Sequence, residues 1–327
     1  MTSAPDREQE PERRGAGVVD PRNLPWRAWL QILRRVLRRL GDDRFSLHSA
    51  AVAFFAVLSV APVLLTALSV YGAVNTPTQA MTHLSGVVDV LPPAVGDVLA
   101  DQLVSITAAS TQVLTVRGLL AVAVALGTAT TATTFLMEAL TVAYREEETR
   151  GRLRRTGVAL ALVLGGAVAV GAVISASTVL FRTLSGVPDV VRSVVVAAVW
   201  VGLALLMVLT LAVLYRFAPD RRGRARWRWV SVGSVSATLA WLLTSAALFG
   251  YVTNFSSYER TYGSLAGVAI SMLWLWLTVL LVVLGAALNA ESERQTARDT
   301  TVGAERRPGR RGAVVADDVP PHPEDQG

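Results

Sequence analysis

The side chains that carry out most enzyme chemistry are few and scattered in this sequence. It has no cysteine and three histidines, which are His48, His83 and His322. Phosphodiester hydrolysis usually needs metal ions held by clustered carboxylates and histidines, or a histidine pair acting as acid and base. The histidines lie at the start of an apolar run, in a polar segment and in the C-terminal tail, and the acidic residues are equally dispersed. We therefore expect no catalytic centre, no metal site and no cofactor, and in particular no nuclease.

Glu138 is the carboxylate that falls inside a long apolar run, near the end of that run. An ionisable group within a membrane is by default a candidate for function. The alternative is that Glu138 lies close enough to the surface to pair with Arg145 or a neighbouring arginine, and we favour that alternative. The threonines between Thr128 and Thr134 also allow two interpretations, because they could line a path or bond to their own helix backbone.

The last apolar run carries a stripe of small and polar residues. At about 100° per residue these positions fall within one arc of a helix. Such a stripe permits close helix packing or lines a wet cavity, because a lipid-facing position gains nothing from glycine or a carboxamide. Packing is the favoured role of Gly263 and Gly267, whereas Asn289 could cap the helix, bond across helices or contact a solute. The stripe and the tyrosine before it comprise Tyr262, Gly263, Gly267, Ser271, Trp274, Thr278, Gly285 and Asn289.

The composition indicates that these apolar runs cross a membrane. The 327 residues are 52% hydrophobic and 17% charged, which is too apolar for an ordinary soluble domain. About 20 consecutive apolar residues cross the hydrocarbon core as a helix. We therefore predict an all-α polytopic membrane domain over residues 45–292. Its six transmembrane helices are expected at about residues 47–72, 118–144, 157–180, 190–217, 230–253 and 263–290.

The first of these predicted spans contains Pro62 in its interior. Proline lacks the N–H group that would bond one turn back, so we expect a local break or kink there. Ser59 lies one turn earlier and could satisfy a freed backbone group. Both residues are candidates for lining a cavity or a helix contact.

The loops between the predicted spans differ sharply in charge. Arginine is dense in residues 145–155 and 216–228, whereas residues 182–192 and 254–262 are nearly neutral. Basic loops stay on the cytoplasmic side of a plasma membrane. With six crossings, both basic loops and both basic termini fall on that side, so we expect cytoplasmic termini.

The segments that flank the spans are expected to lie at the membrane surface or in water. Residues 26–42 combine apolar residues at helical spacing with arginines mostly on the other side, which predicts an amphipathic interfacial helix. A second amphipathic helix is expected on the external side, within residues 75–115. Residues 1–25 and 293–327 are polar and predicted to be disordered. The first helix would bind the lipid bilayer and its anionic headgroups through Arg27, Arg34, Arg35, Arg38 and Arg39.

Three blocks resemble the YihY or virulence factor BrkB family of bacterial inner-membrane proteins, which has also been labelled ribonuclease BN. They are the run from Ser49 to Pro62 with its paired phenylalanines, the run from Tyr215 to Trp241, and the run from Tyr258 to Ala290. The resemblance implies a six-helix inner-membrane protein, but it does not supply a reaction. The chain departs from the family pattern at Ala287, where members usually have glutamate, and at Thr141, where they usually have asparagine.

These features lead to two functional hypotheses. The first is a transporter-like or lipid-handling protein of the cell envelope, in which the span with Pro62 and the small face of the last span border a cavity. The second is a non-transporting scaffold or assembly factor that recruits partners through its surface helix and tails. A continuous polar cavity would distinguish them. We expect no nucleic-acid partner, while a homo-oligomer or an envelope protein partner is left open.

Overall fold

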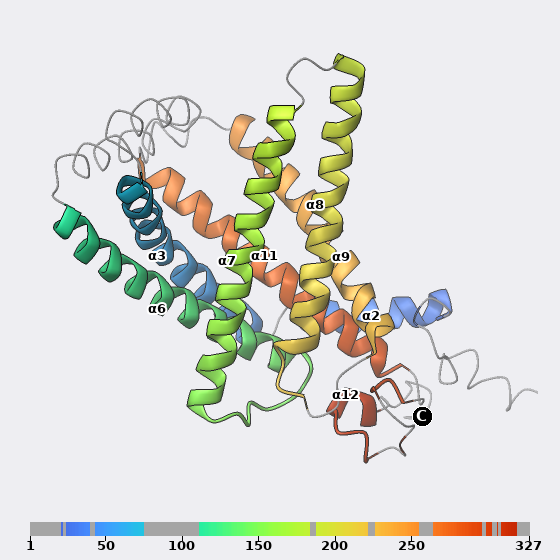
Figure 1. The fold of residues 1–327 in the computed structure, drawn as a ribbon. Helices are drawn as coiled ribbons and strands as arrows, with labels where there is room; N and C mark the ends of the chain where they lie inside the picture. Colours follow the sequence, from blue (N-terminus) through green and yellow to red (C-terminus); the bar gives the residue numbers. More distant parts are fainter. Residues whose placement is uncertain are drawn as a thin grey trace, which may run out of the picture.

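The fold is that of a bundle of long helices, seen in a computed structural model (Figure 1). It describes residues 21, 24–39, 43–74, 111–183, 188–221, 226–254, 264–295, 299–302, 306 and 309–318. The six longest helices follow the apolar runs, because a helix bonds its own backbone groups where lipid offers no partner. The helices are α2 (Trp26–Arg39), α3 (Asp43–Val74), α6 (Thr111–Ala143), α7 (Arg152–Thr183), α8 (Asp189–Phe217), α9 (Trp227–Asn254), α11 (Ser264–Glu293) and α12 (Val314–Asp317).

Six helices of the described part are long and apolar enough to cross a membrane, as predicted. Their candidate spans are Arg44–Val63, Gly118–Ala143, Arg152–Val173, Val190–Phe217, Trp229–Tyr251 and Gly267–Glu293. The predicted external helix within residues 75–115 lies largely outside the described residues. Tyr262, Gly263, His83 and His322 also lie outside them.

The last helix, α11, lies at the centre of the bundle. It packs against α3, α6 and α9, and α2 crosses its C-terminal end. The most extensive contact joins α3 to α6, while α7 packs on α6 and α8 packs on α9. By their contacts, α3, α6 and α7 form one group of helices and α8 and α9 form another, and α11 packs against members of both groups.

The helices are well packed at one end of the bundle and poorly packed at the other. Along α11, residues 267–269 are exposed, the middle of the helix is partly buried, and residues 289–293 are all buried. Helices α6, α8 and α9 show the same gradient towards the same end. We call this well-packed end the arginine-rich end, because Arg35, Arg39, Arg145, Arg221 and Arg294 meet there. We call the other the open end.

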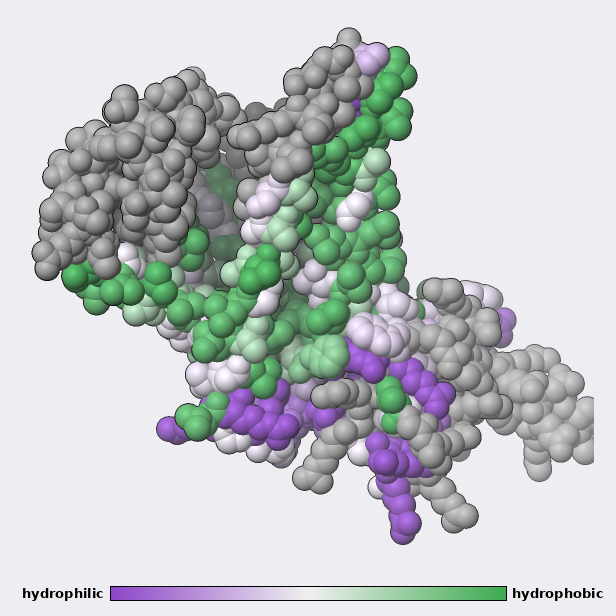
Figure 2. Space-filling model, viewed as in Figure 1, coloured by the Kyte–Doolittle hydropathy of each residue, from purple (hydrophilic) through white to green (hydrophobic). Residues whose placement is uncertain are grey.

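Charge and hydropathy follow the same division. Hydrophilic residues gather at the arginine-rich end, and the shafts of the helices are apolar (Figure 2). The alternation of helix directions places the start of α3, the α6–α7 and α8–α9 connections and the end of α11 at one end, as six crossings require.

Of the break or kink expected at Pro62, the structure shows no break. Helix α3 continues as one helix from Asp43 to Val74, with no break at the proline. Ser59 Oγ lies 2.7 Å from the Phe55 carbonyl oxygen and 2.9 Å from Thr128 Oγ1 on α6. Ser59 therefore supports the contact between α3 and α6, because its hydroxyl group forms a hydrogen bond between the two helices.

The C-terminal tail also differs from the expected disorder where the structure describes it. Residues 309–318 pack against the arginine-rich end, and Val315 is fully buried. The Asp318 carboxylate accepts a 2.6 Å hydrogen bond from Arg294 Nη2, and the Val314 backbone N–H donates to Glu146 Oε1 at 2.8 Å. The charge-assisted bond between Asp318 and Arg294 holds part of a polar tail in place.

Candidate functional site

Two glycines allow α9 and α11 to cross in direct backbone contact. A Cβ atom added to Gly233 would collide with the Gly285 carbonyl oxygen and would lie 2.6 Å from Asn289 Oδ1. A Cβ atom added to Gly285 would collide with the Tyr215 hydroxyl group and lie 2.7 Å from Ala237 Cβ. Small residues permit this approach between membrane helices, so Gly285 is a packing residue in this structure.

Asn289 bonds across helices at the same crossing. Its Oδ1 accepts the Gly233 backbone N–H at 2.6 Å, and its Nδ2 donates to the Val230 carbonyl at 3.2 Å. The Tyr144 hydroxyl lies 3.4 Å from the same Nδ2. Asn289 is fully buried, so of its three proposed roles the structure supports the bond across helices. Tyr215 adds a further link by donating to the Val282 carbonyl at 2.7 Å.

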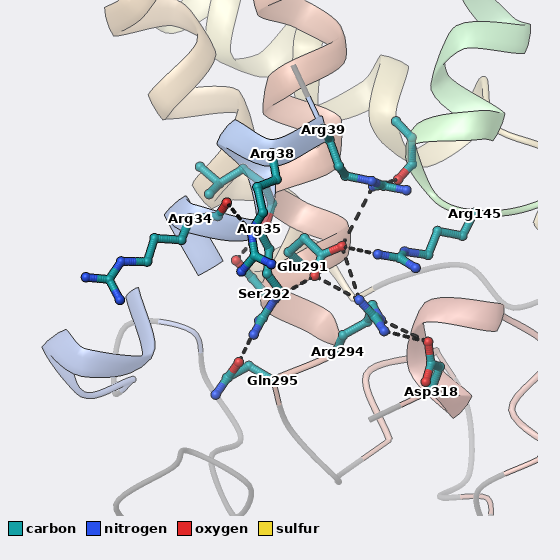
Figure 3. A network of polar contacts seen from close by, with 12 residues as sticks. Arg34, Arg35, Arg38, Arg39, Arg145, Glu291, Ser292, Arg294, Gln295 and Asp318 are labelled. Atoms are coloured by element: carbon teal, nitrogen blue, oxygen red, sulfur yellow. Dashed lines mark hydrogen bonds and ion pairs between the residues drawn. The ribbon is translucent and has the colours of Figure 1, made fainter. Parts of the chain in front are cut away.

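Glu291 follows this crossing by half a turn and collects four arginines from three parts of the chain (Figure 3). The carboxylate is fully buried. Arg35 Nε donates to Oε2 at 2.8 Å, and Arg294 Nη1 donates to the same oxygen at 2.9 Å. Arg145 Nη2 donates to Oε1 at 2.9 Å, and Arg39 Nη1 lies 3.8 Å from Oε1. Glu291 therefore ties α2, the α6–α7 connection and α11 together.

Glu293 forms a second buried ion pair two residues later. Arg221 reaches it with both terminal nitrogens, at 3.1 and 2.9 Å, and the Arg221 guanidinium also lies over the Tyr144 ring. Desolvation by itself would lower the pKa of Arg221, but the facing Glu293 carboxylate outweighs it and holds that pKa above its ordinary value. Thr300 Oγ1 donates to Glu293 as well, at 3.1 Å, so the C-terminal tail also contacts this ion pair.

Arg145 holds its position through an unusual backbone conformation. It has a φ of 58° and lies two residues after Ala143, the last residue of α6, and the Glu146 N–H bonds to the Thr141 carbonyl at 3.0 Å. This hydrogen bond is common where a helix ends in a left-handed residue, but that residue is normally glycine. A residue with a Cβ atom is strained in this conformation. The ion pair between the Arg145 side chain and Glu291 offsets that strain.

This strain gives a testable expectation. Arg145→Gly and Arg145→Ala both remove the bond to Glu291, but only glycine adopts a φ of 58° freely. We expect the glycine variant to be more stable than the alanine variant by about 1 kcal/mol, a value typical of a left-handed residue with a Cβ atom. Chemical unfolding of both variants in detergent micelles measures the difference. Equal stabilities would show that Arg145 is unstrained.

Glu138 pairs with arginine, as the favoured alternative predicted, although not with Arg145. Its carboxylate bonds to Arg155 Nη2, and His48 Nε2 lies 3.8 Å from its other oxygen. Within the run from Thr128 to Thr134, four threonine hydroxyl groups donate to carbonyl oxygens one turn back in α6, those of Thr128, Thr131, Thr133 and Thr134. Back-bonding is therefore their role here, and Thr128 also contacts Ser59.

The predicted stripe on α11 divides into a packed half and an exposed half. Thr278 Oγ1 accepts from Trp241 Nε1 of α9 at 3.1 Å, and Trp274 Nε1 donates to Ser245 Oγ of α9 at 3.2 Å. About one and two turns before Trp274, towards the N-terminus of α11, Ser271 and Gly267 are exposed. A Cβ atom at Gly267 would meet nothing within 4 Å, so this glycine has no packing role in the described structure.

Helix α2 is present as predicted, but its five arginines do not share one role. Arg35 and Arg39 turn to the end of the bundle, where Arg39 also donates to the Ala143 carbonyl at 2.8 Å. Arg27, Arg34 and Arg38 are exposed. The difference arises because α2 buries Ala28, Ile32 and Val36. Arg35 and Arg39 each lie one helical turn after Ile32 and Val36, so they face inwards with this buried side.

The sequence analysis did not single out Glu291 or Glu293 as site residues. The signal that could have found them is the position of two carboxylates directly after the last apolar run, in a chain whose loops on that side are rich in arginine. A buried charge needs a partner, so an acid at that position predicts an arginine contact. Which arginines would supply the contact was not readable from the sequence.

The fold and the buried charges at one end define a polytopic α-helical membrane protein. Its sequence matches the family described as Virulence factor BrkB over residues 36–310, so the chain belongs to this family. It is 28% identical over 261 residues to the ribonuclease-like protein YfkH of Bacillus subtilis, covering 76% of this chain and 92% of that relative. It is also 28% identical over 274 residues to a UPF0761 membrane protein of Ralstonia nicotianae, covering 82% of this chain and 59% of that relative.

A shorter match has higher identity. A UPF0761 membrane protein of Alteromonas mediterranea is 45% identical over 78 residues, which is 24% of this chain and 26% of that relative. The chain thus spans about three fifths of the Ralstonia protein and about a quarter of the Alteromonas one in these matches. No solved structure matches the chain.

Proposed function

We propose that this protein is a transporter-like or lipid-handling component of the bacterial plasma membrane, with both termini in the cytoplasm. One observation carries the proposal: the helices pack tightly at the arginine-rich end and separate towards the open end. A protein that moves a solute or a lipid needs a path that is closed on one side, and such a path commonly runs between helix groups near the middle of the bilayer.

The side chains exposed on the open half of the bundle favour an amphiphilic or lipid substrate for this proposed path. The exposed part of the α11 stripe offers Gly267 and Ser271, and large apolar side chains are exposed on the open half of α8 and α9, including Val194, Trp200 and Phe249. An apolar wall with a few hydroxyl groups suits an acyl chain better than a small charged metabolite. The orientation follows from arginine density, because arginine-rich connections stay in the cytoplasm.

We also propose that the protein is not an enzyme, although YfkH is named ribonuclease-like. Within the described residues, no group of three or more histidine, aspartate or glutamate side chains is arranged to hold a metal ion. The buried carboxylates Glu291 and Glu293 are bonded to arginines, which occupy their oxygen atoms. That arrangement favours a structural role for both acids.

A bulky substitution at the open end tests the transport proposal against the scaffold alternative. The lipids and metabolites of a deletion strain are compared with those of strains that carry the wild type or Ser271→Trp. A large side chain at this exposed position should obstruct the path while leaving the arginine-rich end intact. We expect the Ser271→Trp strain to have the profile of the deletion strain.

The matched control is Val170→Trp, which adds the same ring to an exposed position of α7, outside the stripe. It should restore the wild-type profile. Both variants must be present in the membrane in wild-type amounts. If Ser271→Trp also restores the wild-type profile, transport between the helices is refuted and the scaffold alternative is favoured.

A further inference from the structure

Helix α2 has an apolar side that the rest of the described protein leaves uncovered. Its buried residues Ala28, Ile32 and Val36 lie on one side of the helix. On another side, four large side chains fall within an arc of about 60°, at about 100° per residue. This outer apolar stripe consists of Trp26, Leu30, Leu33 and Leu37, all of which are exposed. Because removing large apolar side chains from water is favourable, we expect an apolar partner to cover the stripe.

Three arginines form an exposed row directly beside the outer apolar stripe. Arg27, Arg34 and Arg38 fall within an arc of about 40°, and its centre lies about 90° from that of the stripe. Arg27 lies over the Trp26 ring, and Arg38 Nε donates to the Arg34 carbonyl at 3.4 Å. Helix α2 has no acidic residue, and in the described part of the chain no carboxylate forms an ion pair with these three arginines. The row therefore presents guanidinium groups to an anion outside the protein.

The other two arginines of α2 contact the protein itself. Arg35 bonds to Glu291 and to Gln295, and Arg39 donates to the Ala143 carbonyl. Figure 3 shows the Arg34 side chain pointing away from Glu291, whereas its neighbour Arg35 points towards it. The sequence alone predicted that all five arginines meet the lipid, but the structure leaves only the outer row to do so.

Helix α2 lies at the level where the membrane spans end. Its Arg35 reaches Glu291, near the end of the candidate span Gly267–Glu293. Its Arg39 guanidinium lies 5.5 Å from the centre of the Phe45 ring, at the start of the candidate span Arg44–Val63. A helix at this level that has an apolar stripe beside a basic row lies in the membrane interface, where anionic headgroups complement its charge. Lipid is therefore a better match to this surface than another protein.

We propose that the outer side of α2 is a docking surface for the anionic phospholipids of the leaflet at the arginine-rich end. The outer apolar stripe lies among the acyl chains, and Arg27, Arg34 and Arg38 donate hydrogen bonds to the headgroup phosphates. The inner side of the same helix bonds to the end of α11, so α2 attaches the arginine-rich end to the membrane surface. This surface is separate from the proposed transport path at the open end, and either can fail without the other.

Lipid binding to the full-length protein in detergent tests the arginine row. Native mass spectrometry measures the apparent affinity for phosphatidylglycerol and for neutral phosphatidylcholine, and phosphatidylglycerol should bind more tightly. An arginine near an anionic surface contributes about fivefold, so the double variant Arg34→Gln, Arg38→Gln should bind phosphatidylglycerol about 25-fold more weakly than the wild type. Arg35→Gln is the matched control, because it removes the adjacent arginine on the inner side of the same helix. It should bind phosphatidylglycerol as the wild type does.

The proposal is overturned if the double variant binds phosphatidylglycerol as tightly as the wild type does. It is also overturned if Arg35→Gln weakens binding as much as the double variant, or if phosphatidylcholine binds as tightly as phosphatidylglycerol.

Fluorescence quenching in nanodiscs tests the outer apolar stripe. A dye attached to Leu33→Cys should be strongly quenched by phospholipids with brominated acyl chains. The same dye on Gln31→Cys, about 160° away around the helix, should be quenched much less. If the dye at Leu33→Cys is not quenched, and native mass spectrometry shows a dimer that Leu33→Asp converts to a monomer, the stripe joins two copies of the chain and the lipid proposal is wrong.

Discussion

Glu291→Ala is expected to lower the free energy of unfolding by about 3–5 kcal/mol, the cost of removing one partner from a buried ion pair. The substitution leaves the guanidinium groups of Arg35, Arg145 and Arg294 close together, with their shared carboxylate gone. Because those arginines belong to different segments, the loss should loosen the whole arginine-rich end. Unfolding in mixed micelles, followed by circular dichroism, measures the change.

Glu138→Ala is the matched control for this substitution. It removes the same side chain from another arginine pair, but Glu138 is 28% exposed and its partner Arg155 is 23% exposed. Partly exposed pairs contribute about 1 kcal/mol or less. If both variants lost the same stability, the burial of Glu291 and its several partners would have no energetic consequence, and its description as the organising residue of this end would be wrong.

Gly233→Ala should destabilise the protein, although alanine normally favours a helix over glycine by about 1 kcal/mol. The added methyl group would meet the Gly285 carbonyl oxygen and the Asn289 side chain. Overpacking of this kind costs about 1–3 kcal/mol, and more where backbone must move. The hydrogen bond from the Gly233 N–H to Asn289 would also be stretched. The same unfolding experiment measures this effect.

Gly267→Ala makes the same chemical change on α11 at a position where a Cβ atom meets nothing within 4 Å. It should leave stability unchanged or raise it slightly. The opposite order, with Gly267→Ala destabilising and Gly233→Ala neutral, would mean that the glycine pair singled out in the sequence forms the close contact and that the crossing in the structure is incorrect.

The six spans were predictable because each depends on a property that is local in sequence. A run of about 20 apolar residues identifies a spanning helix without any knowledge of its neighbours. The alternation of arginine-rich and neutral loops can likewise be recognised by counting the arginines in each loop. For the same reason the pairing of Glu138 with a nearby arginine was foreseeable, since the start of α7 follows closely after the end of α6.

The partners within the site were not predictable, because they are far apart in sequence. Arg35 and Glu291 are separated by 256 residues, and Gly233 and Asn289 by 56. The spacing of Gly263 and Gly267 predicted a close contact, but spacing within one helix does not say which glycine meets another helix. In the described structure that role belongs to Gly285 and Gly233, where α9 and α11 converge.

Cysteine accessibility along α11 tests most directly the claim that the bundle is closed at the arginine-rich end and open at the other. The chain has no cysteine of its own, so single substitutions can be probed in intact membranes with a water-soluble maleimide. We predict that Gly267→Cys and Ser271→Cys react, that Thr278→Cys reacts slowly, and that Ala287→Cys, which is fully buried, does not react. Uniform protection of all four positions would contradict an open path beside α11.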